Sequence, residues 1–256
     1  MTTKATDSAE QALRAKIWQT PEDRGALSIY ADWLLQHGDA TRGEYMQLSL
    51  IAKQTPAQAK RRDALLKKHR GTWLGPARPF VYTWEESDTS PGFIAEAKCS
   101  TKKLAAGFEH VRALGPRIVV EINPTANARD RAVLASLPLG TLYGLSLADA
   151  DVFWLKDRTV RELLPALAGL RALRLCVFDD DTRGSFSIDT WRALLDAIPT
   201  LEEIHLMAES SPGDSYVEAL LEHPIASRLR TLSFGHSKHL QRAIRKACPK
   251  AALTFW

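Results

Sequence analysis

The sequence predicts a mixed α/β protein in which a helical N-terminal domain, residues 1–75, precedes a repetitive strand-and-helix domain, residues 76–256. Three observations predict this organisation. Apolar residues in the first part of the chain recur at three- and four-residue spacing, as in amphipathic helices. A short leucine pattern then recurs at intervals of 21 to 31 residues. Amphipathic helical stretches separate the copies of that pattern.

The N-terminal domain is expected to consist of helices. We expect them over residues 7–19, about 21–37, from about 41, and 56–70. Pro21 fits the first turn of the second helix, because proline lacks the N–H that this turn leaves unpaired. Gly38 is expected to end that helix in the left-handed conformation. After Pro76 the pattern changes, and residues 80–84 are expected to form a strand followed by a polar loop.

The pattern Leu-x-x-Leu-x-Leu defines the second domain. The strong copies are Leu142-Leu145-Leu147, Leu170-Leu173-Leu175, Leu201-Ile204-Leu206 and Leu229-Leu232-Phe234. One strand-helix unit cannot bury its own apolar face, so neighbouring units must stack into a parallel sheet with helices outside. The pattern therefore predicts a leucine-rich-repeat solenoid arc of about six units, with the sheet concave and the helices convex. Leu173 and Ile204 share one frame position, and we expect both to be buried.

An ordinary doubly wound α/β sheet is the alternative architecture. It would also alternate strands with helices. The chain, however, has no Gly-rich strand-to-helix turn of the phosphate-binding kind. Four copies of the pattern in register, each followed by a helix, favour the repeat arc.

The N-terminal domain resembles a known bacterial family. The motifs are Tyr30-Ala31-Asp32-Trp33-Leu34, Gly38-Asp39 and Arg42-Gly43-Glu44-Tyr45-Met46, followed by Trp73-Leu74-Gly75-Pro76. Over residues 10–76 they resemble the "repeat-companion" domain, which is typically found beside leucine-rich repeats. The resemblance implies little about activity, because the family has no well-established biochemical role. Within the motif, Tyr30 and Trp33 are expected to anchor helices, and Asp32 to cap a helix or pair with Arg42.

Composition limits the classes of function. There are 34 basic and 30 acidic residues, and a formal net charge of +4 does not by itself indicate a nucleic-acid partner. Three widely spaced cysteines cannot form a disulfide framework, which suits a reducing compartment. The N-terminal residues lack the apolar core of a signal peptide, and no apolar run is long enough to span a membrane. We therefore expect a cytoplasmic protein without a cofactor.

The residues between the frame leucines are expected to form the binding face. The frame places Lys98, Glu121, Ser146, Arg174, His205, Ser233 and Thr254 in one column across the sheet. The flanking columns contain Glu96, Val119, Ala172, Glu203 and Thr231 on one side, and Asn123, Cys176, Met207 and Trp256 on the other. Arg174 can make forked hydrogen bonds, and Met207 adapts to irregular surfaces. This face is predicted to bind another protein, as a regulator, inhibitor or adaptor.

Acidic residues follow two of the strands. Asp149 and Asp151 follow one strand, and Asp179 and Asp181 follow the next. Carboxylates on adjacent loops could hold a hard cation, but the spacing does not match a calcium loop. We expect a hydrated acidic rim, without a metal, that extends the partner-binding face.

Two other functions remain as alternatives. Residues 60–70 carry a basic run that could contact phosphates, but no aromatic residues are interleaved to stack on bases, so nucleic acid is not the expected partner. Cys176 and His205 lie on neighbouring predicted strands and could in principle form a thiol catalytic pair. An open sheet face lacks the enclosed pocket of most enzymes, so the sequence favours binding without catalysis.

Overall fold

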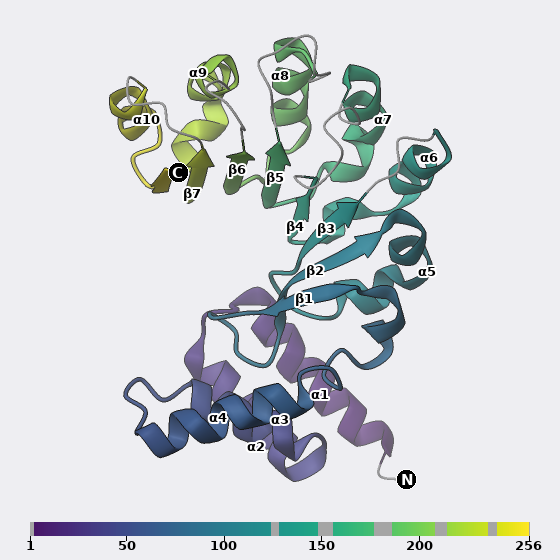
Figure 1. The fold of residues 1–256 in the computed structure, drawn as a ribbon, viewed down its shortest axis with the longest axis vertical. Helices are drawn as coiled ribbons and strands as arrows, with labels where there is room; N and C mark the ends of the chain where they lie inside the picture. Colours follow the sequence, from purple (N-terminus) through teal and green to yellow (C-terminus); the bar gives the residue numbers. More distant parts are fainter. Residues whose placement is uncertain are drawn as a thin grey trace. The chain divides into compact units, whose positions relative to one another are not determined.

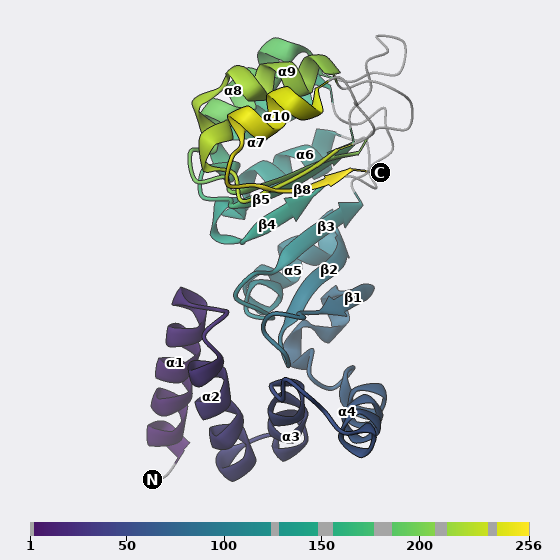
Figure 2. The ribbon, with the colours of Figure 1, turned by 90° about the vertical axis from the view of Figure 1, so that its left-hand side faces the viewer.

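The computed structural model describes residues 3–123, 128–147, 156–176, 186–207, 214–234 and 240–255 (Figures 1 and 2). The chain divides into two compact units. Unit 1 comprises Met1–Ala97 and Glu109–Ile118, and unit 2 comprises Lys98–Phe108 and Val119–Trp256.

The N-terminal part of unit 1 is helical. It contains α1 (Thr3–Gln19), α2 (Arg24–His37), α3 (Ala40–Ser49), α4 (Pro56–His69), the 3-10 helix η1 (Gly75–Phe80) and the strand β1 (Thr83–Glu86). The strand β2 (Ile94–Ser100) and the helix α5 (Thr101–Arg112) each contribute residues to both units.

At both ends of α2 the structure differs from what the sequence predicts for Pro21 and Gly38. Asp23 caps the helix by accepting hydrogen bonds from the backbone N–H groups of Gly25 and Ala26, at 2.9 and 3.1 Å. Pro21 therefore precedes the helix and does not lie in its first turn. Gly38 follows the last turn with φ −145° and ψ −109°, which is not the left-handed conformation. Its N–H donates to the carbonyl of Leu34 and so closes the helix without a left-handed residue.

The expected strand over residues 80–84 begins later than the sequence suggests. Residues Gly75–Phe80 form η1, and β1 covers Thr83–Glu86. Prolines explain the delay, because Pro76 lies at the start of η1 and Pro79 lies inside it. Proline fixes φ near the helical value and cannot donate a hydrogen bond to a neighbouring strand.

Phe93 lies in the core of unit 1. It is fully buried, and its ring packs 5.4 Å from that of Trp18 and 5.7 Å from that of Tyr30, between ring centroids. Arg42 lies over the same ring at 5.1 Å and donates from Nε to the carbonyl of Gly92 at 2.8 Å. The sequence had suggested that Arg42 pairs with Asp32. Asp32 instead accepts a hydrogen bond from Gln47.

Unit 2 alternates strands with helices. Its remaining strands are β3 (Val119–Asn123), β4 (Gly144–Ser146), β5 (Ala172–Cys176), β6 (Glu203–Met207), β7 (Thr231–Phe234) and β8 (Ala252–Phe255). Its remaining helices are α6 (Ala128–Ser136), η2 (Leu139–Thr141), α7 (Asp157–Leu167), α8 (Ile188–Ala197), α9 (Asp214–Glu222), η3 (Pro224–Arg228) and α10 (Gln241–Ala247).

The described strands form one sheet of eight in the order β1 to β8. From β3 to β8 each strand pairs in parallel with the next. The strand order follows the chain, without the reversal that defines a doubly wound sheet. Within unit 2, α6 to α10 lie on one side of these strands (Figures 1 and 2).

The frame leucines face that helical layer. Leu173 and Ile204 are exposed by 1% and 0%, which confirms that they are buried. They pair directly across β5 and β6, and Leu145 and Leu232 continue the row on β4 and β7. Side chains alternate between the two faces of a strand. The residues between the leucines therefore belong to the opposite face of the sheet.

Candidate functional site

The observed register aligns the predicted central column across the sheet of unit 2. Its successive partners are Glu121, Ser146, Arg174, His205, Ser233 and Thr254. A second column runs beside it through Val119, Gly144, Ala172, Glu203, Thr231 and Ala252. We call the face that carries these two columns the open face, because no described helix of unit 2 covers it.

Exposure varies along the open face. Ser146 and Ser233 are each exposed by only 2%. Arg174 and His205 lie between them and are partly exposed, and Thr254 near the end of the column is exposed. The accessible part of the column thus includes Arg174, His205 and Thr254, whereas Ser146 and Ser233 are buried.

Pairs of side chains hold the open face in place. Lys98 Nζ lies 2.8 Å from Glu121 Oε1, and both side chains are largely buried. The hydroxyl of Tyr143 donates to Glu203 Oε1 at 2.5 Å and spans from the start of β4 to β6. Val119, Tyr143 and Ala172 pack together as a small buried apolar cluster. Two predicted binding residues, Glu121 and Glu203, are therefore fixed within the chain.

The environment of His205 on the open face favours its neutral form. Burial lowers the pKa of His205 below 6.5, and the positive charge of Arg174 lowers it further, whereas the Glu203 carboxylate raises it. A neutral imidazole offers one hydrogen-bond donor and one acceptor. Arg174 adds donors only, so the two neighbours together present a mixed polar surface.

The remaining predicted site residues are described only in part. In the register, Cys176 is opposite Met207, and His205 lies two residues before Met207 on β6. The side chains of Cys176 and Met207 lie outside the described residues, as do Asp149, Asp151, Asp179 and Asp181.

Two arginines of the basic run on α4 pair with acidic side chains. Arg61 makes a forked hydrogen bond to Glu44 from Nε and Nη2, at 2.8 and 2.7 Å. Arg62 pairs with the adjacent Asp63 at 2.7 Å. Lys60 and Lys67 are exposed.

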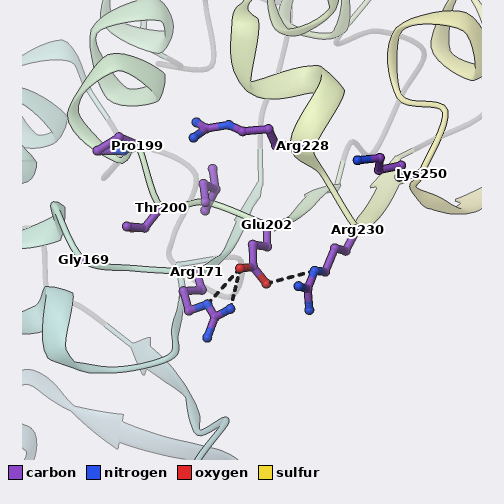
Figure 3. Close-up of a pocket in the computed structure, with 9 residues that line it drawn as sticks. Gly169, Arg171, Pro199, Thr200, Glu202, Arg228, Arg230 and Lys250 are labelled. Carbon is purple, nitrogen blue, oxygen red and sulfur yellow. Dashed lines mark hydrogen bonds and ion pairs between the residues drawn. The ribbon is translucent and has the colours of Figure 1, made fainter. Parts of the chain in front are cut away.

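A pocket of about 600 Å³ lies at the edge of unit 2 where β5 to β8 begin (Figure 3). Four basic side chains and one carboxylate contribute to its lining. Its charged residues are Arg171, Glu202, Arg228, Arg230 and Lys250. We call this feature the basic pocket.

Glu202 holds two of the pocket's guanidinium groups in place. Its Oε1 accepts hydrogen bonds from Arg171 Nε and Nη2, at 3.1 and 2.5 Å. Its Oε2 lies 3.5 Å from Arg230 Nε on the other side (Figure 3). Arg171 also lies over the ring of Tyr143 at 5.7 Å, and Tyr143 bonds to Glu203 of the open face. The basic pocket and the open face are therefore joined through one aromatic side chain.

The basic pocket lies outside the predicted columns, although the sequence contains a signal for it. Arg171, Glu202 and Arg230 each follow the first leucine of a frame copy, at Leu170, Leu201 and Leu229. The predicted columns began one residue later, with the side chains on the open face. Extending the alignment of frames by that one position would have revealed an Arg-Glu-Arg row.

The described side chains include no group of three or more His, Cys, Asp or Glu arranged to hold a metal ion. In the same residues, no helix has the combination of length and apolar character needed to cross a membrane.

Comparisons with known proteins give little further guidance. No protein-family model and no curated protein matches the chain. A solved structure described as the Rad7 and Elc1 complex in yeast is similar with a TM-score of 0.35 and 11% sequence identity. The similarity covers 100% of this chain and 52% of the other, so the chain spans about half the length of that neighbour. At this TM-score the similarity carries no argument about function.

Proposed function

We propose that the chain is a non-catalytic protein-binding module of the leucine-rich-repeat kind, and that its partner binds on the open face. The observation that carries this proposal is the in-register column of polar side chains on the face opposite the helices. Parallel repeats place variable side chains on such a surface without disturbing the leucine core. The internal pairs at Glu121 and Glu203 limit the loss of side-chain entropy on binding.

The helical part of unit 1 is proposed to be a repeat-companion domain. Its motif residues support this, because several of them form the core: Tyr30 and Met46 are fully buried, and the rings of Tyr45 and Trp73 pack in a tilted arrangement with centroids 4.9 Å apart. The motif residues thus stabilise the fold of the helical part, whatever its activity. The free, buried thiols of Cys99 and Cys248 suit a reducing compartment, and we propose that the protein acts in the cytoplasm.

The proposal is tested by weakening the open face alone. The partner is first captured from an extract of the source cells, identified and purified, and its affinity is measured by calorimetric titration. The double variant Arg174→Ala/His205→Ala is expected to bind at least about tenfold more weakly, because a few residues, often arginines, contribute most of the binding energy at protein interfaces. Its melting temperature should remain close to that of the wild type.

The matched control is Lys60→Ala/Lys67→Ala, which removes two exposed side chains from α4. This control should bind like the wild type. If the α4 variant loses affinity and the open-face variant does not, the partner binds elsewhere and the proposal is wrong. The proposal would also be contradicted if the wild-type protein did not bind the purified captured protein and was instead retained on DNA or RNA in a salt-sensitive way.

A further inference from the structure

The lining of the basic pocket has an excess of positive charge, counted over the residues that the structure describes. Four basic side chains surround one carboxylate, that of Glu202. Glu202 is already engaged by Arg171 and Arg230. Within the described residues, Arg228 and Lys250 have no ion-pair partner, and both are exposed. Unpaired cations beside a preformed pocket are a suitable arrangement for binding anionic groups.

The positions of the cations indicate an extended ligand with several charges. Arg171 and Arg230 precede β5 and β7, which are two strands apart, and Lys250 precedes β8. The backbones of β5 and β7 are roughly 10 Å apart, because neighbouring strands lie ~4.8 Å apart. The side chains of Arg171 and Arg230 nevertheless converge on the Glu202 carboxylate, so Arg228 and Lys250, which precede β7 and β8, are the cations left for a ligand. A peptide with several carboxylates can contact both of them.

The lining of the basic pocket also argues against nucleic acid. None of its lining residues is aromatic. Proteins that bind single strands usually stack bases on aromatic rings, so the pocket lacks that platform. Glu202 is already paired with Arg171 and Arg230, so the charged lining as a whole remains positive toward a carboxylate-rich peptide.

We propose that the basic pocket binds a carboxylate-rich segment of a protein, beside the open face. This inference deepens the proposed function and rests on it for the identity of the ligand as a protein. The bridge from Arg171 through Tyr143 to Glu203 makes the basic pocket continuous with the open face. One partner can thus contact both, with its acidic segment at the start of the strands and its folded surface on the sheet.

The probe for the test is a synthetic hexaglutamate peptide, followed by fluorescence anisotropy with the full chain. The wild type should bind it, and Arg228→Gln/Lys250→Gln should bind at least about tenfold more weakly because two cations are lost. The control Arg245→Gln/Lys246→Gln removes two exposed cations from α10 and should bind like the wild type. Arg174→Ala/His205→Ala should also retain the peptide, which separates this inference from the test of the open face.

Three results would overturn the inference. The first is an absence of measurable binding of hexaglutamate to the wild type. The second is an equal loss in the pocket variant and the α10 variant, which would indicate attraction by net charge alone. The third is tighter binding of a hexathymidylate oligonucleotide than of hexaglutamate, with the same dependence on Arg228 and Lys250, which would assign the pocket to nucleic acid. None of these results would affect binding of a partner to the open face.

Discussion

Gly92 shows how one residue fixes the path of the chain through the core of unit 1. Its φ is +83°, a region that side chains with a Cβ rarely adopt. A Cβ placed there would lie 2.5 Å from Cγ and 2.8 Å from the sulfur of Met46, which is fully buried. The next residue is Phe93, the aromatic centre of the helical core. Gly92 therefore directs Phe93 between Trp18 and Tyr30.

Replacing Gly92 with alanine should destabilise the protein. We expect Gly92→Ala to lower the free energy of unfolding by about 2 kcal/mol or more, because backbone strain adds to the clash with Met46. The measurement is chemical denaturation followed by circular dichroism.

Gly71 provides the matched control. A Cβ at Gly71 would meet nothing within 4 Å, and its φ is not positive. Gly71→Ala should therefore change the free energy of unfolding by less than about 0.5 kcal/mol. Equal effects at Gly71 and Gly92 would show that the close approach of Gly92 to Met46 is absent in solution.

At the scale of elements, a hydrogen-bonded bridge joins α7 to α8. Asp157 Oδ1, in the first turn of α7, accepts from the backbone N of Ser187 at 2.7 Å and from its hydroxyl at 2.9 Å. The hydroxyl of Ser187 in turn caps α8 by accepting from the N–H of Thr190 at 3.2 Å. One carboxylate therefore orients the residue that begins the neighbouring helix.

Removing this carboxylate should loosen the contact between α7 and α8. Asp157→Ala is expected to lower the free energy of unfolding by about 1 kcal/mol, because two donors of Ser187 lose their acceptor. Asp157→Asn keeps one acceptor oxygen and should lose less. If both variants are as stable as the wild type at pH 7, the bridge makes no net contribution.

The bridge also has a pH dependence with a definite sign. Partial burial raises the pKa of Asp157, but hydrogen bonds from Thr190 and Ser187 outweigh it, so the folded-state pKa lies below 3.8. A depressed carboxyl pKa stabilises the fold above the unfolded-state value and loses that effect as the pH falls through the folded-state value. The stability difference between wild type and Asp157→Asn should therefore be constant near neutral pH and shrink below about pH 4.

The sequence predicted elements well where apolar spacing alone determines them. The helices of unit 1 lie close to their expected bounds, since their apolar faces are regular. The errors at Pro21, Gly38 and residues 80–84 all concern ends of elements. The Asp23 carboxylate determines where α2 begins, and the two prolines in η1 determine where β1 can begin. Apolar spacing carries no information about either cause.

At the scale of the whole molecule, the candidate site follows from the register of the sheet. The frame predicted which residues share a column because a parallel strand repeats the same position in each unit. It did not predict the burial of Ser146 and Ser233, because the repeat frame assigns a residue to a face and not to a depth. It also missed the basic pocket, because Arg171 and Arg230 contribute to the edge of the sheet and not to its open face.

Photo-crosslinking to the captured partner tests the central claim, that the open face of unit 2 binds another protein. The photoreactive residue benzoylphenylalanine replaces Arg174 on the open face, Arg192 on the exposed side of α8, or Lys67 on α4, in three otherwise identical proteins. The account predicts a crosslinked complex from position 174 and none from positions 192 and 67. A crosslink from position 192 or 67, with none from position 174, would contradict it.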